Sequence, residues 1–105
     1  MECLEFIEAP IFSKYVSEYL TDIEYFSLQW ELTLHPDKGD LIPRSGGLRK
    51  IRWGMKEGGK RGGARVIYYW KNKDHQIFLL SIYAKNEMEN ISEKQLKQLR
   101  NEIEK

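Results

Sequence analysis

Cysteine is almost absent from this chain, which contains a single one, Cys3, among its 105 residues. One cysteine cannot form an internal disulfide. Without a second cysteine or a pair of histidines at ligand spacing, the common structural zinc sites are excluded as well. Because structural disulfides are typical of oxidising compartments, their absence favours the reducing cytoplasm. We therefore expect a cytoplasmic protein with no metal and no cofactor.

Long apolar runs are also missing. Residues 1–12 have no basic region ahead of an apolar run, as a secretory signal would. No stretch approaches the ~18 consecutive apolar residues of a membrane span, so neither export nor membrane insertion is expected. A length of 105 residues with 41% apolar composition fits one compact domain, residues 1–105, that buries one core.

The chain has almost no net charge, because its 17 basic residues nearly cancel its 16 acidic ones. The distribution along the chain is uneven. Residues 1–43 carry nine acidic and two basic residues, a net charge of −7, whereas residues 44–65 carry eight basic residues and one acidic residue, a net charge of +7. Such a positive focus is expected of a domain that binds a polyanion such as nucleic acid. A solvated basic loop has the same composition, so charge alone leaves both interpretations open.

Hydrophobic periodicity predicts the first half of the fold. Residues 2–8 alternate loosely and indicate a strand at a sheet edge. Residues 11–20 have apolar side chains at helical spacing, which predicts a helix. A second helix is expected to begin at Thr21 or Asp22 and to end before Pro36. The apolar set of this second helix is Ile23, Phe26, Leu28, Trp30 and Leu34.

The apolar period changes to two after a connection, residues 35–47, that is rich in proline, glycine and aspartate. Residues 48–55, 64–71 and 76–84 are rich in Ile, Val, Tyr and Trp, which predicts an antiparallel meander of three strands. A closing helix follows a capping box made by Ser92 and Gln95, and its apolar residues are Leu96, Leu99 and Ile103. The expected fold class is α+β, with the helices gathered against one sheet face.

Alternation along a strand predicts which side chains share a face. Lys50 and Arg52 fall on one face, and Ile51 and Trp53 fall on the other, which is the natural core side. In the last strand the same rule puts Phe78, Leu80 and Ile82 on one face, opposite Ser81 and Tyr83. One face then presents five polar residues: Lys50, Arg52, Arg65, Tyr83 and Lys85. The register that would bring them side by side does not follow from the sequence.

Such a cluster has a chemistry beyond its charge. Cleavage of RNA through attack of its own 2′-hydroxyl requires a proton acceptor, a cation on the developing phosphorane and a proton donor. Arg65 is the best candidate for the phosphate clamp, because a guanidinium is always charged and binds phosphate oxygens bidentately. Lys50 or Lys85 would serve as base or acid, since crowding of like charges favours the neutral amine. Tyr83 would donate a proton or stack on a base.

The remaining polar and aromatic residues have simpler interpretations. His35 falls at the predicted end of a helix and His75 in a hairpin turn, so neither is well placed for catalysis.

The loop KEGGKRGG lacks the strand, glycine spacing and following helix of a nucleotide-binding loop. We interpret it as a basic hairpin tip that contacts an RNA backbone without sequence preference. The expected backbone contacts are Arg44, Arg49, Lys56, Lys60 and Arg61. Core or interface positions are expected for Tyr15, Tyr19, Phe26, Trp30 and Trp70.

Taken in order, the segments GGLRKIRW, KRGGARVIYYW and FLLSIYAKNEME, within residues 46–89, resemble the RelE superfamily and within it the HigB-type branch. The preceding helix pair with LHPDKGDLIPRSGG is similar to that branch, so the resemblance covers nearly the whole chain. It implies the toxin of a type II toxin-antitoxin system, a ribosome-dependent mRNA interferase that cleaves translated mRNA. The implied partners are mRNA in the ribosomal A site, 16S rRNA and a helix-turn-helix antitoxin.

Carried onto matching motifs, the resemblance assigns the basic residues of the first central strand to Lys50 and Arg52. It assigns the arginine of the next strand to Arg65 and the basic residue after the last strand to Lys85. After that strand the chain departs from the best-known pattern, because residues 86–91 lack a further arginine and a late tyrosine. The identity of the general base is therefore left open.

Two alternatives to a nuclease use the same features. Gyrase-directed toxins share the implied fold but lack the basic catalytic set, and a non-catalytic module that binds RNA or ribosomes needs only the basic face. Retention of Lys50, Arg52 and Arg65 favours a metal-independent endoribonuclease over the gyrase-directed toxin.

Overall fold

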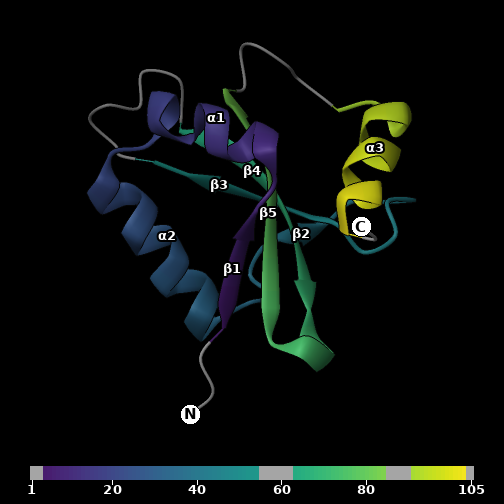
Figure 1. Ribbon diagram of the computed structural model, residues 1–105, viewed down its shortest axis with the longest axis horizontal. Coiled ribbons are helices and arrows are strands. Elements are labelled where there is room, and N and C mark those ends of the chain that lie inside the picture. The colour runs from purple at the N-terminus through teal and green to yellow at the C-terminus, as the bar shows by residue number, and fades with distance from the viewer. Residues whose placement is uncertain (1–3, 55–62, 85–90, 104–105) are drawn as a thin grey trace.

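The computed structural model describes residues 4–54, 63–84 and 91–103 (Figure 1). The elements in chain order are β1 (Glu5–Glu8), α1 (Pro10–Tyr19), α2 (Asp22–Leu34), β2 (Asp40–Leu41), β3 (Arg49–Trp53), β4 (Ala64–Lys71), the 3-10 turn η1 (Asn72–Asp74), β5 (Gln76–Ala84) and α3 (Glu93–Ile103). The predicted α+β class is confirmed. None of the helices in these ranges has the length and apolar character needed to cross a lipid bilayer.

The strands form one sheet of five, in the order β1-β5-β4-β3-β2. Its centre is the predicted antiparallel meander, β3-β4-β5. β1 lies at one edge, as predicted, where it pairs with β5 in parallel. At the other edge lies β2, within the connection for which no strand was predicted, and it pairs antiparallel with β3. Because β2 has only two residues, no periodicity in the sequence could indicate it.

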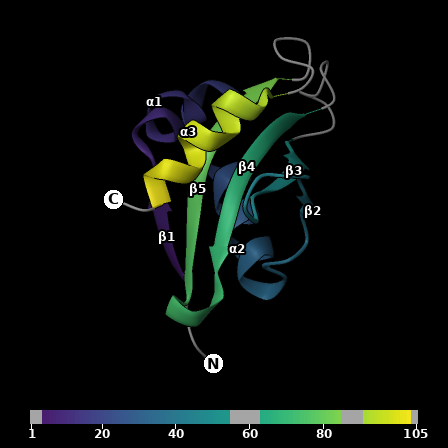
Figure 2. The same ribbon diagram turned by 90° about the vertical axis from the view of Figure 1, so that its right-hand side faces the viewer.

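Helices cover both faces of this sheet. One hydrophobic cluster joins α1 and α2 to the sheet through residues such as Phe12, Leu28 and Val66. A second cluster joins α3 to the opposite face, where Leu96 packs with Ile67. Figure 2 shows α3 and α2 on opposite sides of the strands. The expectation that all helices share one face is therefore wrong. The reason is that the central strands are apolar on both sides, so each face needs a cover.

A bulge in β5 changes the predicted alternation of its side chains. Ile67 pairs with Ser81, but the next residue, Tyr68, pairs with Leu79, so Leu80 is the extra residue. Leu80 and Phe78 pack in the α3 cluster, whereas Ile82 packs in the α1/α2 cluster. The prediction that Phe78, Leu80 and Ile82 share one face is therefore wrong, because the extra residue shifts the alternation by one position.

Two of the three predicted helix starts are confirmed by capping boxes. The Thr21 hydroxyl accepts a hydrogen bond from the backbone N–H of Glu24 at 3.1 Å, and the Glu24 carboxylate accepts one from the Thr21 N–H at 2.8 Å. Ser92 and Gln95 make the same reciprocal pair before α3. These bonds satisfy N–H groups that the first turn of a helix leaves free. The apolar residues predicted for α2 do not all face the core. Leu28 is buried, but Ile23, Phe26, Trp30 and Leu34 are exposed.

Tyr68 of β4 holds the connection before β2 against the sheet. Its buried hydroxyl donates to the carbonyl of Pro36 and accepts from the N–H of Gly39, both at 2.8 Å. A Cβ on Gly39 would lie 2.8 Å from the Tyr68 ring, so only glycine fits this approach. Arg49 adds two hydrogen bonds to the carbonyls of Asp37 (3.1 Å) and Gly39 (2.7 Å). The two side chains thus fix the connection that leads into β2.

Replacing Tyr68 with phenylalanine should lower the free energy of unfolding by about 1–3 kcal/mol. The substitution removes one hydroxyl but leaves two backbone groups without their partner, and this penalty exceeds the value of an average hydrogen bond. Urea denaturation of the purified protein measures the change. Tyr69→Phe is the matched control, because Tyr69 is the next residue of β4 and is only half-buried. Equal stability of the two variants would contradict the role assigned to Tyr68.

Candidate nucleic-acid interface

The strand register puts two arginines and a tyrosine in one row across the sheet. Arg52 of β3 pairs with Arg65 of β4, and Arg65 pairs with Tyr83 of β5. Directly paired residues of antiparallel strands share a face, with Cβ atoms about 4.5–5.5 Å apart. The prediction that these three residues share a face is confirmed. The register, which the sequence did not reveal, makes them immediate neighbours, and we call them the cationic row.

Lys50 borders the cationic row. It lies two residues from Arg52 on the same strand and therefore on the same face, about 7 Å further along. Its cross-strand partner in β4 is Ile67, and its partner in β2 is Asp40. Lys50 thus has an acidic neighbour as well as a basic one, which differs from the crowding of cations that the sequence suggested. Its position suits a second contact to a bound phosphate.

The accessibility of the row decreases from β3 to β5. Arg52 is exposed and Arg65 is half-buried, whereas Tyr83 keeps only 5% of its surface exposed. Stacking of Tyr83 on a nucleotide base is therefore incompatible with its place in this structure. Burial raises the pKa of Tyr83 above its ordinary value of 10.0, although the nearby Arg65 charge acts in the opposite sense. The phenol consequently stays protonated near neutral pH and can act as a donor.

The Tyr83 hydroxyl has no hydrogen-bond partner among the residues that the structure describes. Buried polar groups nearly always have a partner, because an unsatisfied hydroxyl loses its hydrogen bonds to water without compensation. Such groups are typical of sites where stability is sacrificed for function. This hydroxyl lies in the same row as two arginines, so a site for a polar ligand is indicated here.

Several predicted contacts lie elsewhere. Arg49 points to the face opposite Lys50, where it is engaged with carbonyls of the connection before β2. Arg44 lies beside α3, with its Nε 2.9 Å from a carboxylate oxygen of Glu93.

The histidines occupy structural positions, since His35 caps the end of α2 and His75 has a left-handed backbone after η1. Four predicted residues fall outside the described residues: Lys56, Lys60, Arg61 and Lys85. Within the described ranges, no three His, Cys, Asp or Glu residues gather as they would around a metal ion.

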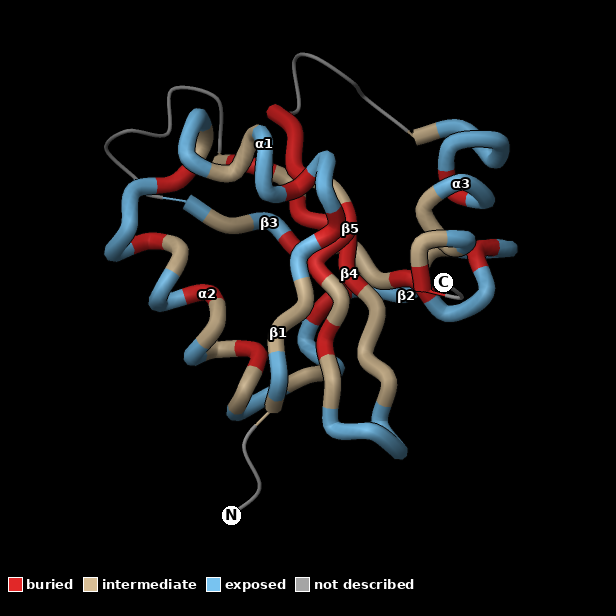
Figure 3. The backbone as a smooth tube through the Cα atoms, in the orientation of Figure 1, coloured by how far each residue is buried: buried red, intermediate tan, exposed pale blue. Residues whose placement is uncertain are grey.

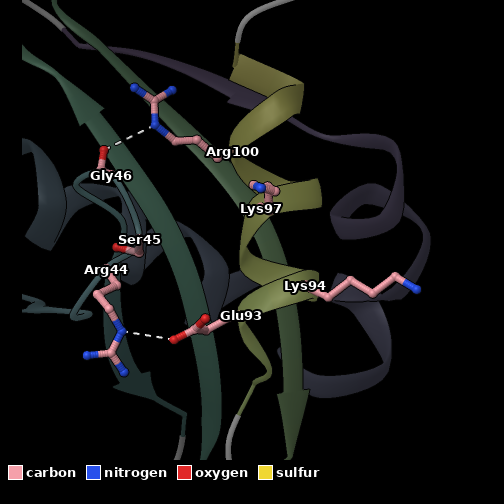
Figure 4. Close-up of a pocket in the computed structure, with 7 residues that line it drawn as sticks. All are labelled: Arg44, Ser45, Gly46, Glu93, Lys94, Lys97 and Arg100. Carbon is pink, nitrogen blue, oxygen red and sulfur yellow. Dashed lines mark hydrogen bonds and ion pairs between the residues drawn. The ribbon is translucent and has the colours of Figure 1, made fainter.

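A second cationic surface lies between α3 and the turn before β3 (Figure 4). It is a groove of about 500 Å³, which we call the α3 groove, lined by Arg44, Ser45, Gly46, Glu93, Lys94, Lys97 and Arg100. The lysines of this groove were not predicted as contacts. The available signal was the spacing of Lys94, Lys97 and Arg100, three residues apart, which puts bases along one side of a helix.

The walls of the α3 groove are fixed to each other by Arg100. Its Nε donates to the carbonyl of Gly46 at 3.1 Å, and its guanidinium lies 4.9 Å from the centre of the Tyr69 ring. Gly46 has a positive φ of 76°, and a Cβ there would lie 2.8 Å from Arg100 Nε. Glycine therefore lets the turn approach the helix closely. Arg44 also has a positive φ, 55°, a conformation that is uncommon outside glycine.

Comparison with known proteins gives two findings. Residues 39–104 match the family model described as the RelE toxin of the RelE/RelB toxin-antitoxin system. A solved structure of the E. coli toxin RelE, a double arginine-to-alanine mutant in the free state, is similar in fold, with a TM-score of 0.57. The two chains are 13% identical, and the match covers 84% of this chain and 90% of that chain. At this identity the structural match supports the fold alone.

Replacing Tyr83 with phenylalanine should leave the protein as stable as the parent, or more stable by up to about 1 kcal/mol, because no residue in the described ranges loses a hydrogen bond. The same substitution at Tyr68 serves as the comparison. The raised pKa adds a pH dependence: above pH 10 the phenol of the unfolded chain ionises before that of the folded chain, so Tyr83 lowers the stability of the folded state as the pH rises. Tyr83→Phe should therefore lose less stability between pH 9 and 11. Urea titrations at each pH measure both effects, and a clear destabilisation at pH 7 would reveal a hidden partner.

Proposed function

Since this chain belongs to the RelE toxin family of toxin-antitoxin systems, we propose that it is an endoribonuclease of the HigB-type branch that cleaves translated mRNA in the ribosomal A site. The observation that carries the proposal is the cationic row, in which Arg52, Arg65 and Tyr83 are cross-strand neighbours. A gyrase-directed toxin would not need this row. The proposed unit is residues 1–105, acting as one toxin domain in the cytoplasm.

In the proposed reaction the 2′-hydroxyl of one nucleotide loses its proton and attacks the adjacent phosphorus. The P–O5′ bond then breaks, which leaves a 2′,3′-cyclic phosphate and a 5′-oxygen that takes up a proton. The non-bridging oxygens gain negative charge in the phosphorane, and Arg65 and Arg52 stabilise it from neighbouring strands. Because strand pairing fixes the two backbones, the two arginines already occupy neighbouring positions when the charge develops. Side-chain cations meet the phosphate charge, so the proposed reaction requires no metal ion and no cofactor.

Proton transfer is assigned to the residues around the two arginines. Lys50, next to Arg52 on the same face, and Lys85, whose role rests on the family resemblance, are the proposed acid and base. Tyr83 is proposed as a positioning residue, because its protonated hydroxyl is buried next to Arg65 and cannot accept a proton from the substrate. It would donate a hydrogen bond within the row once the phosphate is bound.

The α3 groove is proposed to contact the 16S rRNA backbone. Its four bases outnumber the single carboxylate of Glu93, which is already paired with Arg44. Phosphate contacts of this kind position a protein on RNA without reading its sequence. We assign the same role to the predicted loop bases Lys56, Lys60 and Arg61, whereas Arg49 is assigned to holding the connection before β2.

Arg65→Ala should lower the rate of mRNA cleavage on purified ribosomes by about 10²–10³-fold, as loss of one preorganised donor to an oxyanion does. Arg52→Ala should have a smaller effect in the same direction, because Arg52 is more exposed and its charge is better screened. Primer extension on a translated reporter mRNA measures the cuts. Lys71→Ala is the matched control, since Lys71 lies on the same face of β4, roughly 20 Å from Arg65.

Three outcomes would contradict the nuclease proposal. Undiminished cleavage by Arg65→Ala would remove its phosphate role. Ribosome binding with an intact reporter mRNA would instead identify a non-catalytic ribosome-binding module. DNA damage signalling while the mRNA stays whole would identify a topoisomerase-directed toxin.

A double variant of the α3 groove, Lys94→Ala with Lys97→Ala, should bind ribosomes about tenfold more weakly near physiological salt. The slope of log affinity against log salt should decrease by about 1–2, because each phosphate contact releases less than one counterion. Ribosome pelleting at several salt concentrations measures both quantities. Lys14→Ala with Lys73→Ala removes two exposed lysines outside the groove and should leave the slope nearly unchanged.

A further inference from the structure

Helix α2 is apolar on the side that faces the solvent. Ile23, Phe26, Trp30 and Leu34 expose 80%, 68%, 58% and 44% of their surfaces. Their spacing of three, four and four residues puts them in one line along the helix, which we call the α2 stripe. The opposite side of the same helix is also apolar, since Leu28 and Leu32 are fully buried against the sheet. Figure 3 shows the buried positions of α2 turned towards the sheet.

A helix that is apolar on two opposite sides normally has both sides covered, because exposing one of them to water is unfavourable. The four side chains of the α2 stripe expose roughly 500 Å², given the usual area of such residues. This area is most of the ~800 Å² that one partner contributes to a standard protein interface. Two of the four residues are aromatic, and aromatic residues are enriched at interface centres. The α2 stripe therefore has the properties of a protein-docking surface.

Charge around the α2 stripe decides what kind of partner fits. Asp22 and Glu31 lie on α2 at its two sides, and residues 1–43 as a whole have a net charge of −7. Lys38, the base nearest in sequence, forms an ion pair with Glu31 at 3.2 Å. A second copy of this chain would bring two acidic surfaces together, which is unfavourable. A partner with basic residues beside an apolar face is complementary.

The geometry of the α2 stripe indicates the shape of that partner. A single line of apolar residues at a spacing of three and four is the pattern with which one helix packs along another. We propose that the α2 stripe binds an amphipathic helix of the antitoxin, whose apolar side is flanked by lysine or arginine. This inference rests on membership of the toxin family and not on mRNA cleavage. The cationic row lies on the opposite face of the sheet from α2, so the two surfaces are separate.

Trp53 connects helix α2 to the sheet. Its indole N–H donates to the carbonyl of Glu24 and to the Ser27 hydroxyl, at 3.0 and 3.1 Å. Trp53 directly follows Arg52 at the end of β3. The first half of α2 is therefore held by the sheet, and a docking helix would meet a surface that is already formed.

The test uses the full toxin and the protein encoded beside its gene, with affinity measured by calorimetry. Trp30→Ala and Phe26→Ala should each weaken binding by about 30-fold, as loss of an aromatic residue at the centre of an interface does. The matched controls are Leu41→Ala and Ile11→Ala, which shorten apolar side chains that are 60% and 49% exposed outside the stripe. Both should bind within about threefold of the parent. Asp22→Lys should weaken binding several-fold at low salt and less at high salt.

Wild-type affinity of Trp30→Ala and Phe26→Ala would overturn the proposal, as would a failure of the neighbouring protein to bind the unmodified toxin. A dimer of the toxin alone in sedimentation, lost in Trp30→Ala, would identify a second copy as the occupant instead. Thermal melting of each variant shows that the fold is kept, because these side chains are exposed. Cleavage assays without the antitoxin separate this inference from the proposed nuclease: Trp30→Ala should cleave normally, whereas Arg65→Ala should bind the antitoxin normally.

Discussion

The fold and the candidate site both depend on β4, the central strand of the sheet, which is paired on both edges and covered on both faces. Its alternation sends Val66 and Tyr68 into the core under α1 and α2, and Ile67 into the core under α3. Arg65, at the start of the strand, has the same direction as Ile67 and is fixed between Arg52 and Tyr83. Two like charges directly opposite each other destabilise a sheet, and so does a buried hydroxyl without a partner. Arg52, Arg65 and the Tyr83 hydroxyl, for which the described residues supply no partner, lie side by side across the sheet, where the proposed phosphate would meet both arginines.

Structural features that depend on residues close together in the chain could be predicted from the sequence. The capping boxes at Thr21 and Ser92 are local hydrogen-bond patterns, and the three central strands have a clear period of two. Features that depend on contacts between residues far apart in the chain could not be predicted. The extra residue at Leu80, the two-residue strand β2 and the side of the sheet that α3 covers all follow from pairing and packing across the fold.

Counting charges along the chain had the same limit. The basic stretch from Arg44 to Arg65 has a net charge of +7, but its described members separate in space. Arg52 and Arg65 join the cationic row, Arg49 turns to the other face, and Arg44 lies at α3 with bases from the far end of the chain. Neighbours in a strand point in opposite directions, so sequence proximity says little about which charges act together. Alternation along the strand predicted the correct face for Tyr83, because the bulge lies before this residue. Beyond Leu80 the pairing of β5 with β4 is regular again, and Tyr83 pairs with Arg65.

An apolar line on a helix is ambiguous in the sequence for a related reason. Periodicity shows that a helix has an apolar side, but it does not say whether that side meets the same chain or another one. In α2 the answer differs between the two sides, since Leu28 and Leu32 meet the sheet while Phe26 and Trp30 meet the solvent. Asp22 and Glu31 flank the exposed side, and the cationic row lies across the sheet from it. In the proposed function RNA meets the face that carries the cationic row, so the exposed side of α2 is left available for a protein partner.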